Sequence, residues 1–174
     1  MNNIFPSEIV LKRGSHELPS DGSCAMEVAV LAAGFGWHQI VGPFGLPLCF
    51  SRVLGSYVIR LNDTMPDYPR QKLMKYVERL GSTADTPEIE LERTEYLAMN
   101  AAKPAAVCAL MASEFFEHAE KIGAANTFTE FRDVMLGSYD RCSTYFSDSD
   151  VYNVIRYTRS VSYTHLTLPT NREV

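Results

Sequence analysis

The chain has 174 residues, of which 46% are hydrophobic and 21% charged, and its formal net charge is −5. This composition is typical of a globular protein with its own core, and it excludes an intrinsically disordered chain. The apolar runs are far shorter than the roughly 20 residues of a membrane span, and Lys and Arg form no cluster suited to a phosphate backbone. We therefore expect no nucleic-acid partner and no membrane partner.

The apolar residues, read in chain order, follow a helical period over most of the chain. Residues 9–12 suit one short strand. Helical periodicity then begins at Cys24, and Gly34 is a suitable stop for that first helix. The glycine-rich segment 34–47 reads as a loop. The predicted helices cover residues 24–33, 47–62, 69–80, 87–102, 104–122, 127–135 and 150–158.

Two of these helices have strong start signals. Thr86 suits an N-cap and Pro87 the first helical position, where a missing N–H costs nothing. Thr127 and Glu130 fit a capping box, in which each side chain bonds the other's backbone N–H. We predict an all-α fold, an irregular bundle of six to seven helices with an N-terminal loop or short strand. We expect a single helical domain over residues 1–160.

The end of the chain differs from the rest. Residues 161–170 read VSYTHLTLPT, a polar, β-prone string that resembles one reading frame of a transposase adapter used to prepare sequencing libraries. We interpret residues 161–174 as an artefactual tail from a metagenomic read and leave them out of the fold. The alternative is a genuine flexible tail.

The most reactive side chains lie between Gly14 and Glu27, around a loop that leads into the first helix. Ser23 suits the N-cap, which would place Cys24 in the first turn, where the helix dipole lowers the pKa of a thiol. With His16 as its base, Cys24 would be the nucleophile of a cysteine-dependent hydrolase or transferase. The alternative is a small buried thiol that only packs at the start of the helix.

The string Asp-Gly-Ser-Cys before a helix also resembles the nucleophile motif of ovarian-tumour-type cysteine proteases, over about ten residues. That resemblance implies a catalytic histidine late in the chain, on a strand beside an aromatic residue. Here His118 lies in a predicted helix, and His16 lies upstream of Cys24, which is the wrong order for those proteases.

A zinc site is the second chemical hypothesis. Cys24 and Glu27 are three residues apart and so share a helix face, and His16 lies on a loop that could fold over them. Cys49, near the start of the next predicted helix, would be the fourth ligand of a tetrahedral site. In the alternative, His16 and Glu27 bond loop amides while Cys49 packs. The pattern indicates no other cofactor.

Further candidates lie outside this cluster. Trp37 lies in the glycine-rich loop, where it could line a ligand pocket or pack as a lid, and Asn62 and Asp63 end a helix. Cys108 lies on an apolar face and is expected in the core. Without a secretion signal, the cysteines are expected to be reduced. The candidate binding residues are His16, Asp21, Cys24, Glu27, Trp37, Asn62 and Asp63.

A longer arrangement resembles a family of proteins of actinobacteria and their phages to which no activity is assigned. It covers about residues 13–112, and segment 36–46 departs from the family pattern. The resemblance implies no catalytic role for any residue. It is carried by Gly14-Ser15-His16, Asp21-Gly22-Ser23-Cys24-Ala25-Met26-Glu27, Gly34, Pro47-Leu48-Cys49, Leu61-Asn62-Asp63, Met65-Pro66-Asp67, Arg70, Leu73, Leu80-Gly81-Ser82-Thr83, Thr86-Pro87-Glu88-Ile89-Glu90 and Arg93.

Two functions from different classes follow from these observations. The first is a non-catalytic binding or regulatory module, phage-borne or accessory, whose loops 14–23 and 34–47 grip a small ligand or a protein partner. The second is the cysteine-dependent hydrolase or transferase that uses Cys24 and His16. We favour the first, because no downstream side chain completes a catalytic triad. In either case we expect a cytoplasmic protein of a bacterium or of a phage-infected host.

Overall fold

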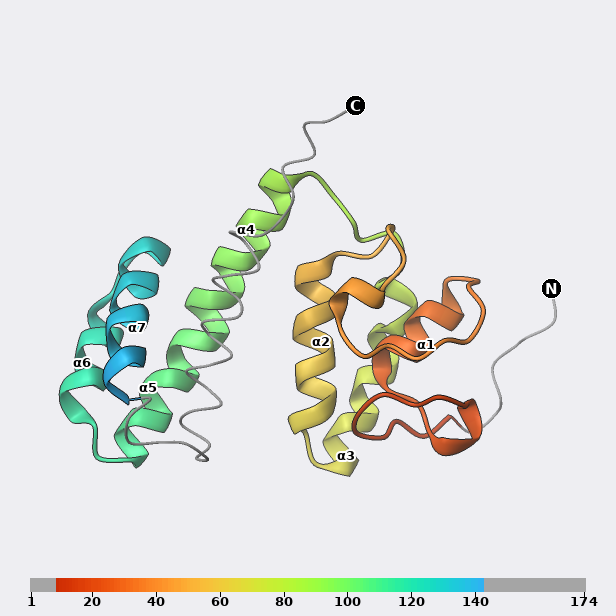
Figure 1. Ribbon diagram of the computed structural model, residues 1–174, viewed down its shortest axis with the longest axis horizontal. Helices are drawn as coiled ribbons and strands as arrows, with labels where there is room; N and C mark the ends of the chain where they lie inside the picture. Colours follow the sequence, from red (N-terminus) through yellow and green to blue (C-terminus); the bar gives the residue numbers. More distant parts are fainter. Residues whose placement is uncertain (1–8, 143–174) are drawn as a thin grey trace. The chain divides into compact units, whose positions relative to one another are not determined.

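The computed structural model describes residues 9–142, and none of these belongs to a strand (Figure 1). Helices and loops make up this part of the chain, which confirms the predicted all-α class. The helix predicted over 150–158 and the tail 161–174 lie outside the described residues. The chain divides into two compact units, Met1–Glu90 and Leu91–Val174. That both belong to one domain stays a prediction.

The first unit is built around α1 (Ala25–Ala32), which packs against α2 (Arg52–Thr64) and the 3-10 helix η3 (Gln71–Arg79). The short helix α3 (Asp67–Arg70) leads directly into η3. Every residue of α1 from Ala25 to Val30 is buried, as expected for a helix that is apolar on nearly all sides. The remaining elements are the 3-10 turns η1 (Pro19–Asp21) and η2 (Pro43–Gly45).

Two elements of this unit differ from the apolar patterns: the N-terminal segment takes the loop alternative, and one helix begins later than expected. In place of a strand over residues 9–12, the structure has one isolated parallel bridge between Leu11 and Ser23. The helix expected from Pro47 begins only at Arg52, because the Ser51 hydroxyl accepts the N–H of Leu54 at 3.1 Å and caps the helix there.

The second unit begins within α4 (Pro87–Leu97), which continues through a π-helical turn η4 (Ala98–Ala102) into α5 (Lys103–Ala112). We predicted a break before Pro104, and that prediction is wrong. Proline has no N–H to donate, and a π-helical turn directly upstream can absorb this irregularity without ending the helix. The chain turns instead at Glu114, whose φ of +64° is left-handed.

Helix α6 (Phe116–Ala124) packs against α5 and α7 (Phe128–Cys142). The predicted capping box is confirmed, because the N–H of Glu130 bonds the Thr127 hydroxyl and the N–H of Thr127 bonds the Glu130 carboxylate, both at 3.2 Å. Cys108, predicted in the core, is exposed. The helical stripe places Ala106 and Leu110 inside instead.

Among residues 9–142, no helix is both long and apolar enough to cross a membrane.

Candidate functional site

The loop that precedes α1 is tied to the rest of the first unit through its backbone. Both the N–H and the carbonyl of Leu11 bond the side-chain amide of Gln71, each at 2.9 Å. The N–H of Lys12 bonds the Ser23 carbonyl at 2.8 Å, and the N–H of Gly14 bonds the Asp63 carboxylate at 2.9 Å. Each end of the loop is therefore fixed by groups that are distant in sequence.

Glu27 is the main anchor of this loop, although it is buried at 1% exposure. Its carboxylate accepts backbone N–H groups from three segments, at 2.7 Å from His16, 2.8 Å from Cys24 and 3.3 Å from Ile40. The ring Nδ1 of His16 lies 3.0 Å from the same carboxylate, which accepts a hydrogen bond from it. A buried carboxylate with this many donors holds backbone in place.

Cys24 caps α1 and does not lie in its first turn, so the prediction that Ser23 is the cap is wrong. The Cys24 sulfur accepts the N–H of Glu27 at 3.4 Å, and the thiol is 2% exposed. Burial, assisted by the negative charge of Glu27, raises the pKa of the Cys24 thiol from 9.0 to about 12. We predicted a lowered pKa for this thiol, and that prediction is wrong. The thiol is buried in the core, where the loss of water disfavours the charged thiolate.

The four predicted zinc ligands are not grouped as a metal centre in the described part of the chain. His16, Cys24 and Glu27 lie together, but through the hydrogen bonds just described, and Cys49 packs half-buried against the core of the first unit. Within residues 9–142, no three His, Cys, Asp or Glu side chains are placed to hold an ion.

Asn62 and Asp63 bind the loop as well. Asn62 is fully buried; its side-chain oxygen accepts the N–H of Ala25 at 3.1 Å and its amide donates to the Lys12 carbonyl at 2.8 Å. The Asp63 carboxylate accepts the N–H of Gly14, as described, and a second hydrogen bond from the Asn62 amide at 3.1 Å. Both residues hold structure in place through hydrogen bonds to residues that are distant in sequence.

Arg70 was named from the sequence only as part of a resemblance and was given no role; it is buried at 2% exposure at the end of α3. Its guanidinium donates to the carbonyls of Asn62 and Met65 at 2.7 and 2.6 Å and to the Asp67 carboxylate at 2.6 Å. These bonds close the turn between α2 and α3. The sequence does contain a sign that Arg70 is buried. It lies three residues before Leu73, which places a charged residue on the apolar face of the predicted helix.

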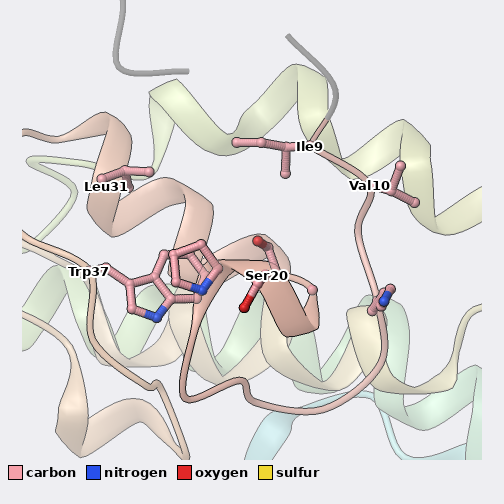
Figure 2. A pocket seen from close by; sticks show the side chains of 9 residues that line it. Ile9, Val10, Ser20, Leu31 and Trp37 are labelled. Atoms are coloured by element: carbon pink, nitrogen blue, oxygen red, sulfur yellow. The ribbon is translucent and has the colours of Figure 1, made fainter. Parts of the chain in front are cut away.

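A surface pocket of about 240 Å³ lies beside the anchored loop (Figure 2). Trp37 forms part of its wall, and the indole N–H is held by the carbonyl of Glu17 at 3.1 Å. The loop supplies a second wall through η1 and Ser23. The lining residues are Ile9, Val10, Lys12, Pro19, Ser20, Gly22, Ser23, Leu31 and Trp37.

The predicted binding residues separate into three groups. Cys24, Glu27 and Asn62 are buried and bonded within the unit. His16 and Asp63 are half-buried, whereas Asp21 is exposed and its carbonyl accepts the Lys12 ammonium at 3.0 Å.

Trp37 alone of the seven lines the pocket. The sequence offered little signal for Lys12 and Pro19, since a lone lysine and a lone proline have many ordinary roles.

No known protein family matches the chain, and neither a curated protein nor a solved structure is significantly similar to it.

Proposed function

We propose that the protein is a non-catalytic binding module and that the pocket beside Trp37 holds its ligand. One observation carries the proposal. The reactive side chains between Gly14 and Glu27 form hydrogen bonds that hold the loop lining the pocket. They therefore shape a binding surface and are not arranged for catalysis.

The buried thiol supports the same proposal. A nucleophilic cysteine must expose its sulfur and form a thiolate near neutral pH. Cys24 has 2% exposure and a pKa raised to about 12, and His16 points its Nδ1 at Glu27. These properties favour a structural role for the cluster.

The size of the pocket sets the class of ligand. Sites for drug-sized molecules enclose roughly 300–1,000 Å³, whereas this one has about 240 Å³. It therefore suits a small molecule of about amino-acid size or a single side chain of a protein partner.

The resemblance to the actinobacterial and phage family stands as part of the proposal, together with a cytoplasmic location. Gly14, His16, Glu27 and Asn62 belong both to that resemblance and to the bonds that fix the loop. The overlap supports a scaffold shared by this chain and that family. It implies no enzymatic reaction.

A fragment screen by ligand-observed NMR tests the proposal. We expect fragments that bind the wild-type protein to lose their saturation-transfer signal with Trp37→Ala and to keep most of it with Trp37→Phe, which retains an aromatic wall. Cys24→Ser should leave binding unchanged, because serine also caps a helix. Circular dichroism checks that each variant keeps its helices. Binding that is indifferent to Trp37→Ala would contradict the proposal.

The cysteine alternative has its own test, which is iodoacetamide labelling at pH 8 read for each cysteine by peptide mass spectrometry. Raising a thiol pKa from 9.0 to about 12 reduces its thiolate population at this pH about a thousandfold. Cys24 should therefore label far more slowly than the exposed Cys108. Fast labelling of Cys24 would favour the enzyme hypothesis over the binding module.

A further inference from the structure

Lys12 is the one cationic residue among those that line the pocket, and the structure holds it firmly. Its backbone N–H and carbonyl are bonded to Ser23 and Asn62 at 2.8 Å each. Its ammonium donates to the carbonyl of Asp21 at 3.0 Å. Among the described residues, no carboxylate forms an ion pair with it. The charge therefore retains donors for a ligand.

The stem of Lys12 is packed as well. Gly22 has a φ of +129°, and a Cβ placed there would lie 2.5 Å from the Lys12 Cδ. The lysine thus lies directly over a glycine that leaves room for it. A long side chain that is already ordered loses less rotamer freedom when a ligand binds.

The rest of the pocket is mostly apolar. Ile9, Val10, Pro19 and Leu31 contribute aliphatic surface, and the Trp37 ring is held in place through its N–H. Figure 2 shows Ile9, Val10, Leu31 and Trp37 around the pocket, with Ser20 among them. A ligand here meets one fixed positive charge and an apolar wall with an aromatic face.

We infer that the pocket binds a small organic monocarboxylate, with its carboxylate on Lys12 and an aromatic or aliphatic body against Trp37. This inference rests on the proposed binding function and specifies its ligand class. One cation in the lining matches one negative charge, and a protein of net charge −5 repels polyphosphates. Because the ammonium and the carboxylate are both charged, the hydrogen bond between them is stronger than one between neutral groups.

The sole tryptophan of the chain, Trp37, provides the measurement. Its fluorescence, excited at 295 nm, is followed during titration with phenylacetate and with phenylacetamide, which has the same shape without the charge. We expect a saturable change with phenylacetate and a Kd about three- to tenfold higher for the amide. Raising the salt concentration should weaken phenylacetate binding and leave amide binding unchanged.

Three variants locate the charge. Lys12→Met keeps the length of the stem and should bring the Kd of phenylacetate to that of phenylacetamide, whereas Lys12→Arg should retain the preference for the acid. Lys72→Met removes an exposed lysine that does not line the pocket and should change nothing. Circular dichroism and urea unfolding confirm that each variant is folded.

The outcomes distinguish this inference from the proposed function. Equal binding of acid and amide, unaffected by Lys12→Met, would overturn the carboxylate inference and leave the binding pocket standing. Saturable phenylacetate binding that survives both substitutions would place the ligand elsewhere and overturn both; Lys12→Met is read by fluorescence and Trp37→Ala by saturation-transfer NMR, because the latter variant has no tryptophan. No saturable change with either probe would overturn the carboxylate inference, and the fragment screen would then decide the proposed function separately.

Discussion

The first unit buries polar side chains that bond loops, whereas the second unit is built almost wholly from apolar side chains on helices. Glu27, Asn62 and Arg70 are each at most 2% exposed. In the described part of the second unit, Thr94 is the one buried polar residue beside a core of alanines, Leu110, Ile122, two phenylalanines and Met135.

This difference explains where a ligand site can form. Backbone in a helix satisfies its own N–H and carbonyl groups, but an irregular loop against a core needs partners for them. In the first unit the buried polar side chains are those partners, and the loop that they hold carries the pocket. In the described part of the second unit, Lys103 donates to the Ala125 carbonyl between α6 and α7, but most of the architecture follows from helix packing.

The largest expected effect comes from removing the central anchor. Glu27→Ala leaves the N–H groups of His16, Cys24 and Ile40 without their acceptor, and we expect it to lower the free energy of unfolding by about 3–5 kcal/mol. Hydrogen exchange read for each unit measures it, and Trp37 fluorescence during urea unfolding reports on the first unit alone.

Glu130→Ala is the matched control, since it also removes the carboxylate of a capping box, but an exposed one. Water replaces its bonds, so we expect a loss of about 1 kcal/mol or less. Equal losses for the two substitutions would contradict the contrast between the units.

A second comparison exchanges side chains of similar volume. Asn62→Leu removes the acceptor of the Ala25 N–H and the donor to the Lys12 carbonyl, and we expect a loss of about 2–4 kcal/mol. Leu110→Met in the second unit exchanges one buried apolar side chain for another and should cost less than about 1.5 kcal/mol. Hydrogen exchange read for each unit measures both losses. A larger loss for Leu110→Met would refute the comparison.

The same difference determined what the sequence could predict. The helices of the second unit follow from local signals, such as the apolar period and the Thr127–Glu130 box, and the all-α class is confirmed. Two features of these helices could not be predicted. The helix continues past Pro104 because a π-helical turn tolerates the proline, and no local residue announces such a turn; the chain then turns at Glu114, a non-glycine residue with a left-handed φ.

In the first unit, sequence reasoning recognised which residues were unusual and misjudged their role. His16 and Cys24 do lie near one another, because each is bonded to Glu27. Their role depends on burial and on which backbone N–H groups point at Glu27, and these come from tertiary contacts. The position of Lys12 and the shape of the pocket also depend on tertiary contacts, which cannot be read from the sequence.

Cys24 should make the first unit sensitive to alkaline pH. Its folded pKa of about 12 lies above the unfolded value of 9.0, so above pH 9 the unfolded chain loses a proton that the folded chain keeps. Stability is therefore complete below pH 9 and falls by about 1.4 kcal/mol per pH unit as the pH rises toward 12. Between pH 8 and 10.5 this amounts to about 2 kcal/mol.

The measurement compares urea unfolding of the wild type and Cys24→Ser at pH 8 and 10.5. Serine does not ionise in this range, so the variant should lose about 2 kcal/mol less than the wild type. Cys108→Ser, at an exposed position, controls for the loss of a thiol. Identical pH profiles for the wild type and Cys24→Ser would show that the thiol is not held neutral by burial.

The last comparison makes one chemical change in each unit, glycine to alanine, with opposite signs expected. At Gly22, φ is +129° and an added Cβ would meet the Lys12 stem at 2.5 Å, so Gly22→Ala should destabilise by about 1–3 kcal/mol. At Gly137 in α7 an added Cβ meets nothing within 4 Å, so Gly137→Ala should stabilise by about 0.5–1 kcal/mol through helix propensity. Urea midpoints give both signs. A neutral Gly22→Ala would show that the loop adjusts freely, and Lys12 would then not be held in the position that the carboxylate site requires.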